Sequence, residues 1–103
     1  MLNRSSMAIA LAWLWPLLAG AQAPSALQAR SWAAACANCH GTQGQALAPL
    51  QPLAGLPEAV IVQRMQDFKA GNVPSATVMH QLAKGYSDAQ IIAIAAYFAA
   101  QKR

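Results

Sequence analysis

Two cysteines and a histidine at residues 36 to 40 have types and a spacing that can do chemistry. The run Cys36-Ala37-Asn38-Cys39-His40 has the C-x-x-C-H pattern, the attachment signature of a c-type haem. Two thiols three residues apart on one helical turn can each add to a vinyl group of one porphyrin, and the next imidazole can bind its iron. The pentapeptide therefore predicts one covalently attached haem c, with His40 as a metal ligand, and indicates an electron carrier.

Other uses of these residues are a zinc site, a redox dithiol and a structural disulfide. Both cysteines of the chain lie in the pentapeptide, so neither a cysteine-rich zinc module nor a disulfide framework can be built. A zinc site would need both thiols, His40 and the other histidine, His80. A thioredoxin-like dithiol would need strands alternating with helices, and the sequence shows no strand pattern. The small number of cysteines and histidines and the absence of a strand pattern therefore favour haem attachment.

The N-terminal 21 residues have the features of a cleaved secretory signal peptide. Arg4 supplies a positive charge, residues 8–18 are apolar apart from Pro16, and small residues follow. We expect cleavage after Ala21, with Ala23 as the alternative. The apolar stretch would form about 16 Å of helix against a hydrocarbon core of about 30 Å, too little to span a membrane. Haem is joined to exported thiols outside the cytoplasm, so we expect a periplasmic protein with no membrane span after cleavage.

Residues 22–103 are enough for one small domain and too few for two. An apolar core of that size is marginal, and a covalently bound macrocycle would add core surface. Without Arg4 the segment carries six basic and three acidic residues, a net charge of +3, which two haem propionates would lower to about +1. Basic residues cluster only at Lys102-Arg103, at a helix end, so we expect no nucleic-acid partner.

Three helices and two irregular segments are expected to position the haem. An alanine-rich helix from about Ser25 to Cys39 delivers the attachment motif at its C-terminal end. Residues 41–56 contain three glycines and two prolines and predict a loop long enough to wrap a cofactor. The second helix begins with Pro57 as its first residue, carries one apolar stripe and ends before Gly71.

A second irregular segment, residues 72–86, leads to a third helix that ends near residue 101. Ser87 as the N-cap and Gln90 three residues later form a predicted capping box. Alanines on the third helix permit close packing against the alanine face of the first helix. The two terminal helices are therefore expected to close the domain around the haem.

The sixth iron ligand is expected to be a methionine. Met65 lies on the apolar stripe of the second helix, where a core role is the better interpretation. Met79 lies in the second irregular segment, from which its thioether could reach the far face of the ring, and it is the predicted ligand. His80 is the alternative and would give an iron with two histidines and a lower potential.

The imidazole of His40 also needs an acceptor for its second nitrogen, normally a carbonyl group. Pro49 lies nine residues past His40 in the wrapping loop, and its carbonyl oxygen, on a stiff backbone, is the predicted acceptor. Pro52 is the competing choice.

This order of elements resembles the class I cytochromes c over essentially all of residues 22–103. The resemblance implies an all-α fold in which three main helices and two irregular loops surround one covalent haem. It also implies electron transfer without catalytic residues of the chain's own, because Met79 would close the open iron position that a peroxidase or a ligand sensor needs.

A narrower resemblance is to the cytochrome subunit of flavocytochrome c sulfide dehydrogenase. It rests on the residues at 36–44, 52–56, 65–71, 76–79 and 83–88. In that family a flavoprotein subunit oxidises sulfide and passes electrons singly to the haem subunit, which forwards them to other redox carriers. The resemblance implies haem ligation through Cys36, Cys39, His40 and Met79 and a flavoprotein partner. The alternative is an independent soluble periplasmic carrier with one haem.

Overall fold

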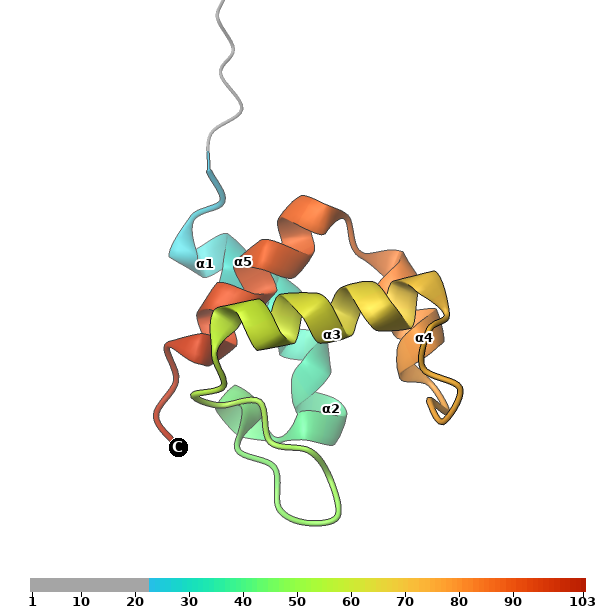
Figure 1. Ribbon diagram of the computed structural model, residues 1–103. Helices are drawn as coiled ribbons and strands as arrows, with labels where there is room; N and C mark the ends of the chain where they lie inside the picture. The colour runs from blue at the N-terminus through green and yellow to red at the C-terminus, as the bar shows by residue number, and fades with distance from the viewer. Residues whose placement is uncertain (1–22) are drawn as a thin grey trace, which may run out of the picture.

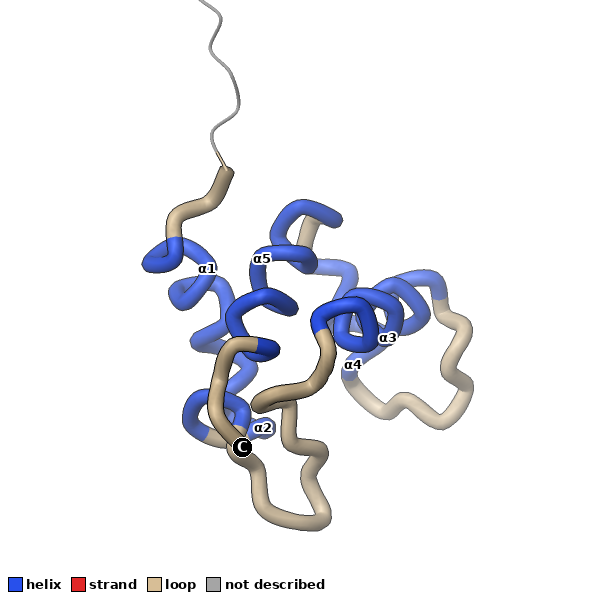
Figure 2. The backbone as a smooth tube through the Cα atoms, turned by 60° about the vertical axis from the view of Figure 1, so that its left-hand side comes forward, coloured by secondary structure: helices blue, strands red, loops and turns tan. Residues whose placement is uncertain are grey.

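A computed structural model describes residues 23–103 of the chain. Five α-helices and three 3₁₀ turns follow in the order α1 (Ala26–Ala33), η1 (Ala34–Cys36), α2 (Ala37–His40), η2 (Thr42–Gly44), α3 (Glu58–Ala70), α4 (Met79–Leu82), η3 (Ala83–Gly85) and α5 (Asp88–Ala99). Figure 2 shows helices joined by loops and no strand in this part of the chain, which confirms the all-α prediction.

The predicted signal peptide and its cleavage site fall on residues outside the described range. Within residues 23–103, none of the helices combines the length and the apolar character that crossing a bilayer would require.

The helices pack around α5, which is in contact with both α1 and α3. Figure 1 shows α3 lying across the molecule, with α2 and α4 below it on opposite sides. The predicted packing of the two terminal helices is confirmed, because α1 and α5 are extensively in contact. The loop between η2 and α3 extends beyond the helices at the end where α2 lies (Figures 1 and 2).

The first predicted helix is present but is not uniform. Ser25 caps α1 through a hydrogen bond that its side-chain oxygen accepts from the Gln28 amide at 3.1 Å. The chain then tightens into η1 and continues as α2, which ends where Gly41 takes a positive φ of 78°. The helical path therefore reaches the attachment motif as expected, with a 3₁₀ turn that ends at Cys36, the first residue of the motif.

The second predicted helix is shifted by one residue at its start. Pro57 has a ψ of 136°, so it is the N-cap of α3 and not its first helical residue. The other end agrees with the prediction, because Gly71 closes α3 in the left-handed conformation with a φ of 76°.

The prediction of an irregular segment from residue 72 to residue 86 is only partly right. Residues 72–78 are irregular, but α4 begins at Met79 and runs directly into η3. A helix of four residues is too short to show a hydrophobic period, and Pro74 and Gly85 on either side indicated a loop.

The capping box of α5 is confirmed. The Gln90 amide donates to Ser87 Oγ at 3.1 Å, and the Ser87 amide donates to Gln90 Oε1 at 2.9 Å. A second link joins this end of α5 to α3, since Lys69 Nζ donates to the Tyr86 carbonyl oxygen at 2.7 Å and lies 3.1 Å from Asp88 Oδ1. These bonds fix the turn between η3 and α5 against α3.

The core formed by the described residues is small. Nine apolar residues are buried, and four of them are alanines: Ala33, Ala54, Ile61, Met65, Ala83, Ile91, Ile94, Ala95 and Phe98. No polar or charged residue in the range 23–103 is buried. So small a core supports the expectation that a bound macrocycle supplies part of the apolar interior.

Candidate haem site

The two attachment cysteines lie on consecutive helical turns next to the predicted proximal ligand. Both thiols are free of disulfides; Cys36 is half-buried against the core and Cys39 is exposed. Cys36 ends η1, whereas Cys39 and His40 end α2. The three side chains that the motif assigns to one haem therefore come from one short helical stretch.

His40 is held by a main-chain carbonyl group. Its Nδ1 donates to the carbonyl oxygen of Gln51 at 2.6 Å, which leaves Nε2 free to bind a metal. The predicted acceptor, Pro49, and the competing choice, Pro52, are both wrong, because the residue between them supplies the oxygen. This hydrogen bond fixes the tautomer and the orientation of the imidazole, as is usual for histidines that bind a metal in proteins.

The role of the Gln51 carbonyl group could not be predicted from the sequence, because no side-chain type marks the residue whose main-chain oxygen accepts this bond. Any residue in the loop offers the same oxygen, and the chain path alone decides which one reaches Nδ1. The two prolines did mark the correct segment of the loop.

Backbone hydrogen bonds hold the loop in the shape that presents this oxygen. The Gly44 carbonyl accepts from the amides of Leu53 at 2.8 Å and Ala54 at 3.1 Å, closing the loop at its base. The Gly55 amide donates to the Phe98 carbonyl oxygen at 2.9 Å, which fastens the same base to α5. The His40 acceptor is therefore positioned by the last helix of the chain through the loop.

Gly44 is required at the base of this loop. It is buried and has a φ of 76°, and a Cβ built there would lie 2.8 Å from the Phe98 ring and 2.9 Å from the Ala54 nitrogen. A side chain at this position would have to adopt an unfavourable backbone conformation and displace both neighbours.

The dithiol and zinc interpretations find no support in this geometry. Burial raises the pKa of the Cys36 thiol, whereas the reactive thiol of a redox dithiol has a lowered pKa. Within residues 23–103, no three side chains of the His, Cys, Asp and Glu types gather where they could hold a metal ion. Cys36, Cys39, His40 and His80 thus do not form a zinc site.

The two candidate methionines occupy different places. Met65 on α3 is 8% exposed and belongs to the core between α3 and α5, which confirms its core role. Met79 is the first residue of α4 and is half-buried against the edge of that core. His80 follows it and is also half-buried, and its Nδ1 has no hydrogen-bond partner among the described residues.

Large apolar side chains are exposed on the segments that carry the predicted haem contacts. In the loop that holds Gln51, Leu47 is 84% and Leu50 is 52% exposed; on α4 and just before it, Leu82 is 53% and Val78 is 54% exposed. A largely apolar macrocycle attached at α2 would cover surface of this kind. Two thiols, one oriented imidazole and uncovered apolar side chains form a set that fits a covalent haem.

Comparison with known proteins gives the family. Residues 27–102 match the family described as cytochrome c. This chain belongs to the cytochrome c family. Family membership implies covalently attached haem c, and the length of the chain is consistent with one haem.

Individual relatives in this family differ in size and in name. The chain is 39% identical over 79 residues to cytochrome c4 of Azotobacter vinelandii, covering 68% of this chain and 38% of that protein. It is 41% identical over 73 residues to cytochrome c-554(548) of Halomonas halodenitrificans, covering 65% of this chain and 84% of the relative. It is 41% identical over 63 residues to the cytochrome subunit of sulfide dehydrogenase of Chlorobaculum tepidum, covering 61% of this chain and 56% of that subunit. The chain thus spans well under half of the cytochrome c4 that it matches.

Proposed function

We propose that this cytochrome transfers electrons one at a time through a single haem c, held by Cys36 and Cys39 and ligated by His40 and Met79. The haem, when bound, supplies a one-electron iron couple. The chain supplies its attachment, its axial ligands and the apolar surroundings that exclude water. The proposal includes a signal peptide at residues 1–21, a single cytochrome domain at residues 22–103 and export to the periplasm.

The observation that carries this proposal is the bond from His40 Nδ1 to the Gln51 carbonyl oxygen. His40 directly follows Cys39, and both attachment cysteines are free of disulfides. An imidazole held in one tautomer, with Nε2 free, is ready to bind the iron of a cofactor. The bond also raises the basicity of the ligating nitrogen, which strengthens its bond to iron.

Met79 is proposed as the ligand on the other face of the ring. Of the four methionines, Met1 and Met7 precede the described range and Met65 is occupied in the core, which leaves Met79 for the iron. A thioether is a weak, neutral donor that favours ferrous iron and raises the potential. With both axial positions filled, the iron would exchange electrons without binding substrate.

The partner that we propose is a sulfide-oxidising flavoprotein subunit, from which this chain would accept electrons. The support is the sequence resemblance described above and the similarity to a protein named as the cytochrome subunit of sulfide dehydrogenase. Two segments of that resemblance, 65–71 and 83–88, lie together, joined by the bonds from Lys69 to Tyr86 and Asp88. They therefore form one structural unit.

Purification from the native host tests the partner. We expect a flavin-containing chain to accompany the cytochrome through affinity and size-exclusion steps, and sulfide to reduce the haem only when that chain is present. A cytochrome that elutes alone as a monomer, and that sulfide does not reduce in the cell extract, would refute the partner and leave the haem site intact.

An independent periplasmic carrier is the second candidate. The observation that favours it is the match to cytochrome c-554(548), 84% of which is covered by this chain. The same purification separates the two candidates, because an independent carrier would exchange electrons with several redox proteins and remain in complex with none.

A further inference from the structure

Helix α5 is apolar on the side that faces away from the core. Its core side carries the four buried residues Ile91, Ile94, Ala95 and Phe98. The opposite side, which we call the outer face of α5, has the three- and four-residue spacing of one helix face and consists of Ala89, Ile92, Ala93, Ala96, Ala99 and the C-cap Ala100. Ile92 is 51% exposed, and of the alanines only Ala93 and Ala99 are half-buried.

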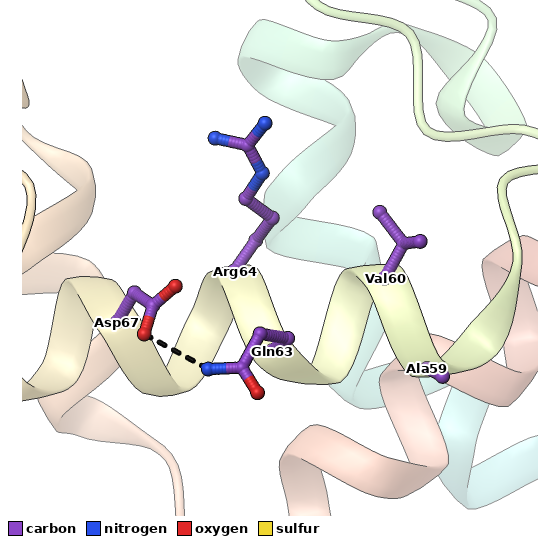
Figure 3. Close-up of a pocket in the computed structure, with 5 residues that line it drawn as sticks. All are labelled: Ala59, Val60, Gln63, Arg64 and Asp67. Atoms are coloured by element: carbon purple, nitrogen blue, oxygen red, sulfur yellow. Dashed lines mark hydrogen bonds between the residues drawn. The ribbon is translucent and has the colours of Figure 1, made fainter.

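Such a composition is unusual for a helix at the surface of a protein. A surface helix normally presents polar side chains to water, and a helix that is apolar on all sides is normally covered on all sides. Helix α3 follows this rule: Figure 3 shows Gln63, Arg64 and Asp67 projecting from it, with a hydrogen bond from Gln63 to Asp67. Helix α5 has no charged residue after Asp88. It therefore has the composition of a helix whose outer face is covered as well.

The haem is not expected to provide this cover. Its proposed attachment and ligands lie on η1, α2 and α4. In Figure 1, α2 and α4 lie below α3, whereas most of α5 lies above it. We therefore expect another molecule on the outer face.

The small side chains of the outer face favour a helix as its partner over a lipid surface. Helices that lie on membranes insert large apolar side chains, whereas five of the six residues here are alanines. Alanine lets another helix approach closely and loses no side-chain entropy when it is buried.

The outer face is complementary to itself when two copies meet antiparallel. Its one large side chain, Ile92, lies near the N-terminal end of α5, and Ala99 and Ala100 lie at the other end. A two-fold axis at Ala96 would place Ile92 of each copy over these two alanines of the other. A parallel pair would instead place Ile92 against Ile92.

The charges at the two ends of α5 favour the same orientation. Asp88, the first residue of α5, pairs with Lys69, but its side chain is still 71% exposed. Lys102 and Arg103 follow the other end and are exposed, and the Lys102 carbonyl oxygen accepts from Gln45 Nε2 at 2.9 Å, which holds this segment in place. In an antiparallel pair Asp88 of each copy approaches the two cations of the other, whereas a parallel pair brings like charges together.

We propose that two copies of this chain associate as a two-fold dimer through the outer faces of α5, packed antiparallel about Ala96. Helix α5 has 12 residues and is about 18 Å long, so the interface is small and the dimer exchanges with the monomer as the concentration changes. The side that carries the haem stays free for redox partners. The proposal goes beyond the electron-transfer function, and its failure would leave that function untouched.

Sedimentation equilibrium of the exported, haem-loaded protein measures the association. We expect a monomer–dimer equilibrium in the wild type, and Ile92→Lys should raise the dissociation constant by about tenfold or more because it places a charge against alanines. Val60→Lys is the matched control, since Val60 is a branched apolar residue of α3, 43% exposed, and should leave the constant unchanged (Figure 3). A wild type that stays monomeric up to about 1 mM would overturn the proposal, as would equal effects of the two variants.

Cross-linking tests the orientation. The haem occupies both native cysteines, so Ala96→Cys and Ala89→Cys each introduce the one free thiol of the loaded protein. In the antiparallel pair, residue 96 lies opposite itself and residue 89 does not, so mild oxidation should link Ala96→Cys into a disulfide dimer and leave Ala89→Cys monomeric. Linking of both variants, of neither, or of Ala89→Cys alone would overturn the antiparallel dimer.

Two further outcomes would assign the outer face to a different partner. A monomeric wild type that loses a co-purifying flavin-containing chain on Ile92→Lys, but not on Val60→Lys, would assign the face to that chain. A monomeric wild type that binds phosphatidylglycerol vesicles, with binding lost on Ile92→Lys, would assign it to lipid. Either result would overturn self-association.

Discussion

His40 and Met79 differ in how the chain holds them. The imidazole is fixed by the Gln51 carbonyl oxygen at 2.6 Å, whereas the thioether is positioned only by α4 and its contact with the core. The role of His40 as an iron ligand is predicted from the pentapeptide, because the histidine of a C-x-x-C-H motif is the residue that binds the iron. Its acceptor was not predictable from residue types, because every residue of the loop has a carbonyl group.

Met79→Ala should open one face of the iron. We expect a lower reduction potential, loss of the weak far-red sulfur-to-iron band and binding of carbon monoxide by the ferrous protein, because a soft donor is removed. Met65, the other methionine of residues 23–103, is buried in the core and cannot replace it. Met65→Leu is the matched control. It removes the buried methionine with little change in volume and should leave the band in place.

Optical spectra of both variants, with a redox titration, make the measurement. An unchanged far-red band and potential in Met79→Ala would show that the ligand has been assigned wrongly. His80→Gln in the same series separates the alternative, since only a ligating His80 would make that change alter the spectrum.

At the scale of elements, the sequence predicted the long helices well and the short ones poorly. Ser87 and Gln90 fixed the start of α5, and Gly71 fixed the end of α3, because capping chemistry is local. The four-residue α4 and the turn η1 escaped prediction, because neither is long enough to show a period. The conformation of α4 depends on the packing of α4 and η3 against α3, which is not local information.

Alanine substitutions at two glycines distinguish the stability cost of an unfavourable backbone conformation from the stability cost of overpacking. Gly44 and Gly71 both have a φ of 76°, but a Cβ at Gly71 meets nothing within 4 Å, whereas one at Gly44 meets Phe98 and Ala54. We expect Gly71→Ala to lower the free energy of unfolding by about 1 kcal/mol, through the unfavourable φ. Gly44→Ala should cost roughly 1–3 kcal/mol more through overpacking.

Denaturant titration of the two glycine variants gives the comparison. Because Gly44 also closes the loop that presents Gln51, Gly44→Ala should in addition perturb the haem spectrum. Equal stability losses in the two variants would show that the Gly44 contact with α5 does not matter.

The link between α3 and α5 should depend on pH. Hydrogen bonds from Gln66 and Lys69, together with the Lys69 charge, hold the pKa of Asp88 below its ordinary value of 3.8. A lowered pKa in the folded state means that the carboxylate contributes stability above pH 3.8, and that this contribution is lost as the pH falls through the lower folded value. Wild type should therefore be more stable than Asp88→Asn at pH 7, and the difference should shrink below pH 3.8.

Thermal unfolding across this pH range checks the prediction. A Lys69→Met variant serves as the control, because Asp88→Asn should reduce the stability less in that variant than in the wild type. A difference between wild type and Asp88→Asn that stays constant from pH 7 to pH 3 would contradict the assignment.

At the scale of the whole molecule, the described residues form an all-α fold in which the terminal helices α1 and α5 are in contact, as predicted. The sequence predicted a marginal polypeptide core, but it did not show which of the apolar residues would be exposed. Many apolar residues of the sequence are alanines, and large ones such as Leu47 are exposed, so only nine of residues 23–103 form the buried apolar set. The haem is therefore expected to be part of the fold as well as its cofactor.

Removal of the haem should consequently unfold the chain. We expect a variant with Cys36→Ala, Cys39→Ala and His40→Ala to lose most of its helical circular dichroism and its cooperative thermal transition. A native-like helical signal with a cooperative transition would show that the polypeptide core is sufficient by itself.

The intact mass of the exported protein, measured under denaturing conditions, tests the central claim most directly. We expect the mass of the processed polypeptide plus one haem, and the polypeptide mass alone when Cys36 and Cys39 are both changed to alanine. A wild-type mass equal to that of the amino acids alone would contradict covalent haem attachment and, with it, the proposed electron-transfer function.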